Sequence, residues 1–314
     1  MNVAGGSFQA GDGHVPVTPR SRSLRAMVTR MGDNGAGQEG AWRQRGLQAT
    51  EALHETWESL ADATHGLSSA EWALPTECPG WDVKDQLSHL IGIERTLMGE
   101  AAPAWDGPLG DHVKNDFAAM HERWIAVRRS RPGPEVHAEF VEVTRTRLDQ
   151  LRARSEEEWA QVGFSPVGDV PYAVFMEVRA FDCWVHEQDA RRALDRPGGA
   201  GNHASAISLD RMQGAMPFVV GKKAGCAEGT AVRFAIAGER DDARAFTVAV
   251  EGGRAKPAAD DLDPTVTLAM PTDAFVRLSC GRATAAQVEA AGGVEVAGDA
   301  AVARRVLDAM NFLF

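Results

Sequence analysis

The sequence contains no run of about 18 apolar residues, so it predicts no membrane-spanning helix. It also lacks the short apolar segment of a secretion signal near its first residue, and we expect a cytoplasmic protein. Lys and Arg number 33 against 44 Asp and Glu, which gives a net charge of -11. No basic stripe with interleaved aromatic residues is present. These features argue against nucleic acid or an anionic membrane as a partner and favour a small molecule.

Cysteine is scarce as well, and the cysteines lie far apart in the chain: Cys78, Cys183, Cys226 and Cys280. None forms the two-residue spacing of zinc ribbons or redox pairs, so we expect free thiols. Cys183 follows Asp182 but points about 100° away from it around a helix, which favours packing over a nucleophilic role. The sequence also has no Ser-His-Asp order, glycine-rich phosphate loop or paired-carboxylate hydrolase signature.

Helical periodicity dominates the first two thirds of the chain. Residues 1–40 are glycine-rich and aperiodic, which predicts a disordered N-terminal tail. The pattern that follows predicts long helices over residues 41–65, 82–98, 136–159 and 171–194, and a shorter helix over residues 111–129. In the shorter helix we expect Phe117, Met120 and Trp124 to face the core. Long helices joined by short turns favour an antiparallel four-helix bundle over residues 41–195.

Composition changes over residues 195–205, where the segment DRPGGAGNHAS is typical of a linker. Beyond it, TAVRFAIAG, ARAFTVAVEGG and PTVTLAMP alternate in the manner of strands, and helical stretches lie near residues 206–220, 272–278 and 299–310. The predicted fold class is therefore a helical bundle followed by a small α+β domain over residues 205–314.

Two titratable residues lie one turn apart on the apolar side of the helix predicted over residues 171–194. Asp182 and His186 share this face with Val178, whereas Trp184 and Glu187 point the other way. A carboxylate removed from water costs several kcal/mol unless a cation compensates it. The helix therefore requires either an arginine or a metal ion beside Asp182.

His89 is the candidate for a third metal ligand, because it lies in the middle of the second predicted helix beside Leu90. Two imidazoles and one carboxylate leave coordination positions open, as in catalytic divalent sites. Two alternatives stay open: Asp182 pairs with Arg179 or another arginine, and His186 is a hydrogen-bonded core histidine. We expect the remaining histidines of the folded part in solvent, since they lie on polar faces or in loops: His54, His65, His112, His121, His137 and His203.

The segments TECPGWDVKDQLSHLIGIE (residues 76–94) and VRAFDCWVHEQDARRAL (residues 178–194) strongly resemble the mycothiol-dependent maleylpyruvate isomerase family. The resemblance covers about residues 41–314 and implies a DinB-like four-helix bundle with a sterol-carrier-like C-terminal domain. It also implies mycothiol as a thiol cosubstrate and a divalent metal, usually zinc, at the positions of His89, Asp182 and His186. The isomerase itself looks to use glutamate where this chain has Asp182, which puts ligand geometry and metal preference in doubt.

The resemblance implies an enzyme in which the metal activates a thiol for addition to an electrophile or an unsaturated carboxylic acid. The choice between S-transferase and maleylpyruvate-type isomerase depends on the shape of the pocket. Arg282, in the segment CGRAT, is a candidate for binding a substrate carboxylate, and a surface salt bridge is its alternative role. Two other interpretations stay open: a non-catalytic, metal-stabilised binding module and a metal-free bundle held by ion pairs. The sequence indicates no particular oligomeric state.

Overall fold

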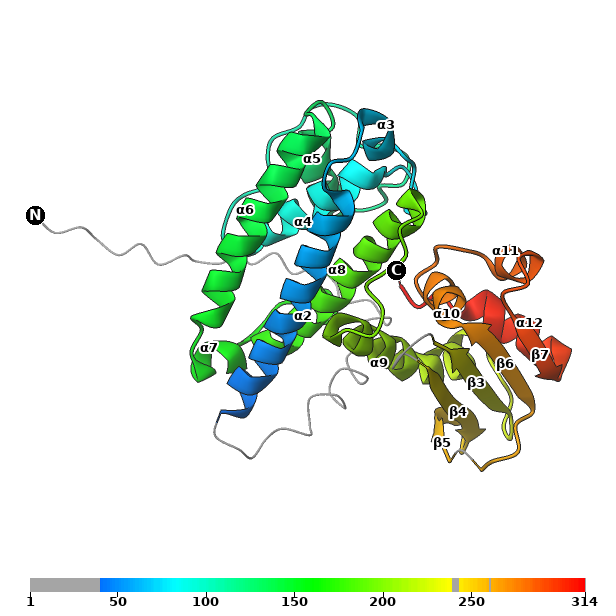
Figure 1. Cartoon of the computed structure of the whole chain (residues 1–314). Coiled ribbons are helices and arrows are strands. Elements are labelled where there is room, and N and C mark those ends of the chain that lie inside the picture. Colours follow the sequence, from blue (N-terminus) through cyan, green and yellow to red (C-terminus); the bar gives the residue numbers. More distant parts are fainter. Residues whose placement is uncertain (1–39, 239–242, 260, 314) are drawn as a thin grey trace, which may run out of the picture.

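The computed structural model describes residues 40–238, 243–259 and 261–313 (Figure 1). The predicted tail, apart from Gly40, lies outside the described residues. The helical part consists of α2 (Ala41–Thr64), α3 (Ser69–Trp72), α4 (Val83–Leu97), α5 (Asp116–Ala126), α6 (Gly133–Arg152), α7 (Glu156–Ala160), the short strands β1 (Val162–Gly163) and β2 (Val170–Pro171), and α8 (Tyr172–Leu194). Helices α2, α4, α6 and α8 are the long ones.

These four helices enclose a common apolar core. Helix α2 packs against α6 and α8, and α4 packs against the same two helices. The core positions predicted for α6, which are Phe140, Val143, Leu148 and Leu151, are all buried. The prediction of one continuous helix over residues 136–159 is wrong, because Ser155 starts a new helix. Its hydroxyl accepts the Glu158 backbone N–H, and the Glu158 side chain bonds back to Ser155, which forms a capping box at the start of α7.

The shorter helix α5 begins at Asp116, five residues later than predicted, because the Asn115 side chain caps it by accepting the Ala118 N–H. Trp124 is buried, as expected. The prediction that Phe117 faces the core is wrong, since the residue is 50% exposed. Its ring packs edge-on against His121, one turn further along α5.

Helix α8 is covered on more sides than its sequence pattern indicates. We predicted that Trp184 and Glu187 point away from the core, and both are nevertheless buried. The reason is that α2 and α9 pack on the side of α8 that the pattern left polar. The Trp184 Nε1–H donates to the Gly199 carbonyl oxygen, and Glu187 accepts the hydroxyl of Ser59. Polar side chains on this face are therefore satisfied inside the protein.

The C-terminal part places helices beside a mixed five-stranded sheet. Its elements are α9 (His203–Phe218), the π-helical turn η2 (Val219–Lys223), β3 (Ala231–Ala237), β4 (Arg244–Glu251), β5 (Arg254–Ala258), β6 (Val266–Pro271), α10 (Thr272–Ser279), α11 (Ala285–Ala290), β7 (Glu295–Gly298) and α12 (Ala300–Ala309). The strand order is β5-β4-β3-β6-β7. Only the β3–β6 pair is parallel among these described strands. The predicted class, helices followed by an α+β part, is confirmed.

Helix α9 lies between the helical part and the sheet (Figure 1). It packs against α2 and α8 on one side and against β4 and β5 on the other. The segment from Asp195 to Asn202, where a linker is predicted, contains no helix or strand. Since α9 contacts both parts, the division into domains at this segment stays a prediction. No helix within the described ranges combines the length and apolar character needed to cross a lipid bilayer.

Candidate metal centre

The second long helix presents His89 to the interior. Helix α4 starts where the Asp82 carboxylate accepts the Asp85 backbone N–H at 2.8 Å. His89 follows two turns later, between Leu87 and Leu90, which are both fully buried. The imidazole is 7% exposed, and neither of its nitrogens has a hydrogen-bond partner in the described part of the chain. An imidazole buried in this way is unusual, because nearly all buried polar groups are hydrogen-bonded.

Helix α8 brings Asp182 and His186 against His89. The His89 Nε2 atom is 3.6 Å from Asp182 Oδ2, and the His186 Nε2 atom is 3.6 Å from Asp182 Oδ1. Ligand atoms from all three side chains lie within 4.8 Å of one another. Bonds of about 2.1 Å in a tetrahedral zinc site place donor atoms roughly 3.4 Å apart. The three residues singled out from the sequence therefore come together with a spacing that fits a divalent ion.

The arginine considered as an alternative partner is also present. Arg179 donates through Nη1 to Asp182 Oδ2 and through Nη2 to Glu94 Oε1, the latter at 2.7 Å. Glu94 is fully buried and also accepts Arg147 Nε at 3.0 Å. Two arginines thus balance two carboxylates beneath the cluster. Asp182 has a compensating cation without any metal, and its second oxygen, Oδ1, faces His186.

Protonation states favour cation binding. Burial alone would raise the pKa of Asp182, but Arg179 and then His186 hold it well below its usual range. Burial, followed by the nearby His186, lowers the pKa of His89 to about 3. At neutral pH the carboxylate is therefore ionised and the His89 imidazole is neutral, which are the forms that ligate metals. The Asp182 side chain is 33% exposed, so the cluster is reached from its side.

Aromatic side chains that the sequence reasoning missed surround the two imidazoles. The Trp81 ring lies 4.8 Å from the His89 ring and 5.6 Å from the His186 ring. His121, which we predicted in solvent, lies 5.3 Å from His89, so that prediction is wrong. Burial lowers the pKa of His121 to about 4, and its Nδ1 has no partner within the described ranges. His121 shares a helical face with Phe117 and Trp124, a spacing that could have indicated an inward position.

The other histidines are further from this cluster. His65 and His203 are exposed, as predicted. Three others are only partly exposed and have partners: His54 with Glu58, His112 with Glu122, and His137 with the Ala61 carbonyl oxygen. These three are half-buried, which is less exposed than expected, and none of them belongs to a group of described residues that could hold a metal ion.

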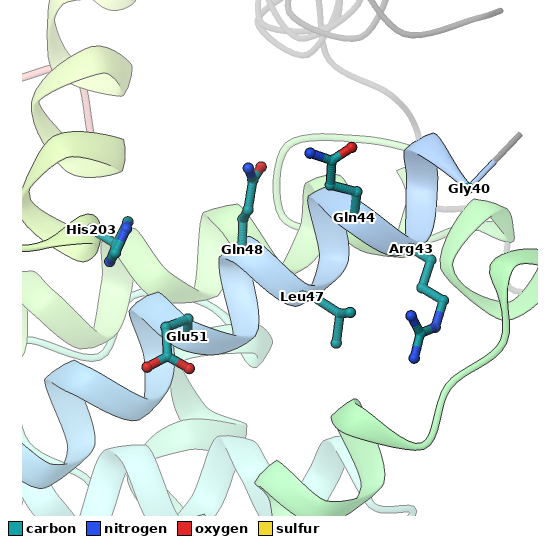
Figure 2. A pocket seen from close by; sticks show the side chains of 7 residues that line it. All are labelled: Gly40, Arg43, Gln44, Leu47, Gln48, Glu51 and His203. Atoms are coloured by element: carbon teal, nitrogen blue, oxygen red, sulfur yellow. The ribbon is translucent and has the colours of Figure 1, made fainter. Parts of the chain in front are cut away.

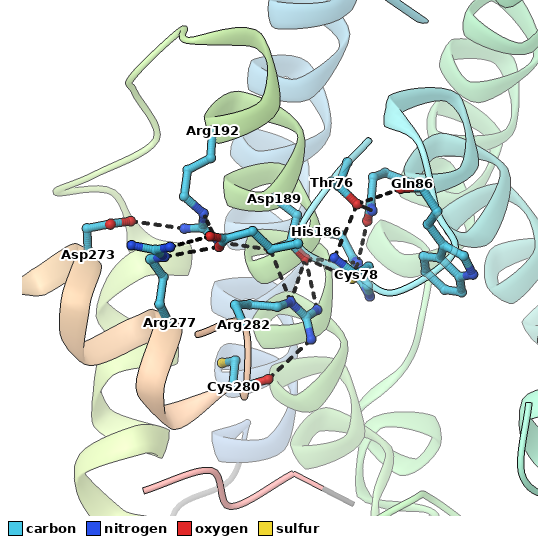
Figure 3. Close-up of polar contacts among 12 residues, drawn as sticks. Thr76, Cys78, Gln86, His186, Asp189, Arg192, Asp273, Arg277, Cys280 and Arg282 are labelled. Carbon is cyan, nitrogen blue, oxygen red and sulfur yellow. Dashed lines mark hydrogen bonds and ion pairs between the residues drawn. The ribbon is translucent and has the colours of Figure 1, made fainter. Parts of the chain in front are cut away.

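A second group of potential ligands shares His186 with the first. It consists of Cys78, His186 and Asp189, whose donor atoms also lie within 4.8 Å of one another (Figure 3). Asp189 already binds two cations, with Arg192 Nη2 at 2.7 Å and Arg282 Nη2 at 2.8 Å. Burial, with the nearby Asp189 carboxylate, raises the pKa of the Cys78 thiol well above its usual value. A protonated thiol beside a carboxylate that is already neutralised is poorly suited to a metal.

The remaining cysteines are buried and free, like Cys78. Cys183 accepts the indole N–H of Trp57 at 3.3 Å, which agrees with a packing role. Burial raises the pKa of Cys183 and of Cys280 to about 12. None of the four described cysteines is placed as an activated nucleophile.

Arg282 lies in a buried ion pair between the two parts of the chain. Its Nε donates to both oxygens of Asp189, at 3.1 and 3.0 Å, and its side chain is 13% exposed (Figure 3). Arg282 therefore does not form a surface salt bridge, and it is not among the residues in contact with His89. Asp189 lies one turn after His186, so Arg282 reaches the neighbourhood of the cluster from the C-terminal part. Its binding of a substrate carboxylate stays a prediction.

A groove runs along α2 (Figure 2). It has a volume of about 530 Å³ and is lined by Gly40, Arg43, Gln44, Leu47, Gln48, Glu51 and His203. A second hollow, of about 650 Å³, lies at the ends of β3, β4 and β6. Neither hollow is lined by His89, Asp182 or His186, so neither belongs to the candidate metal site.

Two family models match the sequence. The mycothiol maleylpyruvate isomerase N-terminal domain matches residues 53–191, and the SCP-2 sterol transfer family matches residues 223–311. Two solved structures, of the mycothiol-dependent maleylpyruvate isomerase and of a point mutant of it, are similar at 18% identity and a TM-score of 0.45. Each comparison covers 82% of this chain and 92% of the other. No curated protein matches the chain. The three candidate ligands lie in the first matched segment, and Arg282 lies in the second.

Proposed function

We propose that the protein is a mycothiol-dependent enzyme, because residues 53–191 match the model of the mycothiol maleylpyruvate isomerase N-terminal domain and residues 223–311 match that of the SCP-2 sterol transfer family. It adds the thiol of mycothiol to an electrophilic small molecule and requires a divalent metal, for which zinc is the first candidate. The cytoplasmic location expected from the sequence is part of the same proposal.

The buried His89 imidazole, with both nitrogens unpartnered and Nε2 facing Asp182, is the observation that supports this proposal most strongly. Such a side chain is costly to bury without a partner. His89, Asp182 and His186 would hold the cation, because two neutral imidazoles and a carboxylate are a common ligand set for zinc. A cation held there supplies positive charge that lowers the pKa of a bound thiol towards neutrality.

The residues around the three candidate ligands would control protonation, exclude water and contact the substrate. Asp182 stays ionised because Arg179 pairs with it, so it does not take up the proton released by the thiol. The rings of Trp81 and His121 flank His89 and exclude water from that side. Phe117, which is half exposed next to His121, offers an apolar contact for a substrate at the mouth of the site.

Two reactions fit a thiol delivered to this place. With a maleylpyruvate-like substrate, the sulfur adds to the activated double bond, the resulting single bond rotates, and elimination of the thiol returns the trans isomer. With another unsaturated electrophile, the carbon next to the new C–S bond takes up a proton, which balances the proton that the thiol released, and the adduct leaves as an S-conjugate. We place thiol addition in general ahead of the specific isomerisation, because both reactions begin with the same step.

The experiment is to combine the purified, zinc-loaded protein with mycothiol and a panel that includes maleylpyruvate and simple electrophiles. We expect mycothiol-dependent isomerisation or thiol consumption that is lost in Asp182→Ala. The control is His65→Ala, an exposed histidine far from the cluster. If the loaded protein neither consumes thiol nor isomerises any compound, the enzymatic proposal fails and a metal-stabilised binding module becomes the better explanation.

A further inference from the structure

The hydroxyl of Thr76 fixes the direction of a short chain of hydrogen bonds behind His186. Thr76 Oγ1 donates its proton to the Trp81 carbonyl oxygen at 3.0 Å, and a carbonyl oxygen only accepts. The hydroxyl oxygen is then left as an acceptor. It accepts the Cys78 backbone N–H at 3.3 Å and Gln86 Nε2 at 2.7 Å. The end of the Gln86 amide that faces Thr76 is therefore the NH₂ group.

The orientation of the Gln86 amide determines which of its atoms faces His186. The Gln86 Oε1 atom lies 2.7 Å from His186 Nδ1 (Figure 3). Because an amide oxygen only accepts, His186 Nδ1 has to donate and carries a proton. In a neutral imidazole the lone pair is then on Nε2, the atom that lies 3.6 Å from Asp182 Oδ1. The direction of the Thr76 hydroxyl thus sets the tautomer of His186.

In the described part of the chain, no other group contacts His186 Nδ1 as closely as Gln86 does. Asp189 Oδ2 is 3.6 Å from His186 Nδ1, which is beyond a good hydrogen bond. The Cys78 sulfur, at 4.0 Å, is at the distance limit for sulfur and is a weak acceptor, since its thiol donates to Asp189 Oδ2. Asp189 is in addition engaged by Arg282 and Arg192. Gln86 itself is fully buried, so water cannot easily take its place. Among the described residues, the Gln86 amide oxygen is therefore the one strong acceptor within hydrogen-bond distance of Nδ1, and its loss would weaken the preference for a proton there.

We propose that Gln86, oriented by Thr76, is a positioning residue that holds His186 in the Nδ1–H tautomer and so presents Nε2 to a divalent cation. The inference rests on the proposed function for the identity of the bound ion, whereas the tautomer itself does not depend on it. A hydrogen bond from the outer nitrogen of a metal-binding histidine orients the ring and raises its affinity for the metal. An uncharged amide does this without adding negative charge to the buried cluster.

The first test uses NMR on the metal-free protein at pH 8, with ¹⁵N-labelled histidine and long-range ¹H–¹⁵N correlation. We expect His186 to be the Nδ1–H tautomer in the wild type and in Gln86→Glu, which keeps an acceptor. In Gln86→Met, which has a similar length and no acceptor at that place, we expect Nε2–H to become populated. An unchanged tautomer in Gln86→Met would overturn the proposal.

The second test measures zinc affinity by competition with a chelator. We expect Gln86→Met to bind zinc about 10- to 100-fold more weakly, and Gln86→Glu to stay close to the wild type. Gln161→Met removes an exposed amide and is the matched control, for which we expect wild-type affinity. Equal affinity of Gln86→Met and the control would overturn the proposal, and so would equal losses in Gln86→Met and Gln86→Glu.

The two tests separate this proposal from the proposed function. If the wild type binds no zinc but shows the Nδ1–H tautomer that Gln86→Met loses, the tautomer assignment stands and the metal assignment fails. Circular dichroism shows whether each variant is folded. Should Gln86→Met unfold, Thr76→Val takes its place: it leaves the amide free to turn, so we expect a mixture of tautomers, and a pure Nδ1–H form would overturn the proposal.

Discussion

His89 is the residue that best distinguishes a metal site from a metal-free core held by ion pairs. A histidine kept only for packing would direct at least one nitrogen to a protein partner, and the described structure provides none for His89. Leaving a buried polar group without a partner costs about 1–3 kcal/mol. An isosteric apolar side chain would avoid that cost in the metal-free protein, and it would also remove the metal ligand.

We therefore expect His89→Leu to have opposite effects with and without zinc. In metal-free protein, the variant should be as stable as the wild type or more stable by about 1 kcal/mol in the free energy of unfolding. Zinc at 100 times its dissociation constant should stabilise the wild type by about 2.7 kcal/mol and the variant not at all. Urea unfolding measures both, with His65→Leu as the control. Equal stabilisation of His89→Leu and wild type by zinc would contradict the assignment.

At the scale of single residues, the sequence predicts the candidate ligands but not the side chains around them. Asp182 and His186 can be found because i, i+4 spacing on one helix is visible in the sequence. The contact of Gln86 with His186 could not be predicted, because it joins two helices and depends on hydrogen-bond direction. The spacing of His121 with Trp124 indicates an inward position, but its contact with His89 also joins two helices. Arg282 could be singled out as a cation, but its partner Asp189 lies in another part of the chain.

Among the helices, Glu139 joins three elements. This α6 residue accepts hydrogen bonds from Arg95 of α4 and from Arg128 and Arg131, which follow α5. Burial alone would raise the pKa of Glu139, but the three arginines lower it to about 2. The side chain is 11% exposed, so this attraction is only partly screened. The cluster therefore contributes stability only while Glu139 is ionised.

The sign of its pH dependence follows from the lowered pKa. The contribution is complete above the pKa of an unfolded glutamate, about 4.3, and is lost as the pH falls towards about 2. We expect Glu139→Gln to lower the free energy of unfolding at pH 7 by on the order of 2 kcal/mol. The difference from the wild type should shrink below about pH 4.3. Urea titrations at several pH values measure it, and a difference that grows on acidification would show that the cluster is not the cause.

Helices α4 and α5 approach closely at Gly92. A Cβ atom added there would lie 2.4 Å from the Cβ of Trp124, whose indole is held by the Thr96 hydroxyl at 3.0 Å. We expect Gly92→Ala to destabilise the protein by about 1–3 kcal/mol from overpacking, although alanine favours helix by about 1 kcal/mol. Thermal unfolding tests this against Gly163→Ala, where the added methyl group meets no atom within 4 Å. A stabilised Gly92→Ala protein would refute the close approach.

Element boundaries were the less predictable part of the fold. Periodicity predicts the long helices well, because each has an apolar face that must be buried. It fails at the end of α6 and the start of α5, where the capping side chains of Ser155 and Asn115 decide the boundary. It fails also for Trp184, because α9, which follows in the chain, covers the outer face of α8.

At the scale of the whole molecule, ion pairs join the C-terminal part to the helical part. Arg282 pairs with Asp189, Arg277 with Glu77, and Arg192 with Asp273. Asp189 is fully buried, so the Arg282 pair is shielded from solvent, whereas Asp273 is exposed. Removing one partner of a buried pair costs more than removing a partner at the surface.

We expect Arg282→Gln to destabilise the protein by roughly 2 kcal/mol, less than for a fully unpaired buried charge because Arg192 stays on Asp189, and to make residues 195–202 more sensitive to protease. Asp273→Asn, at the exposed pair, should cost less than about 1 kcal/mol. Urea unfolding and limited proteolysis measure these effects. A raised KM for a carboxylate substrate with unchanged stability would instead assign Arg282 to the substrate, as the sequence predicts.

The central claim is that His89, Asp182 and His186 together hold one divalent ion, and elemental analysis tests it most directly. The protein and its His186→Ala variant are saturated with zinc, freed of excess metal by gel filtration and analysed by mass spectrometry of the element. We predict about one zinc per chain in the wild type and almost none in the variant, which is checked for folding by circular dichroism. Equal zinc content in the two proteins would contradict the account.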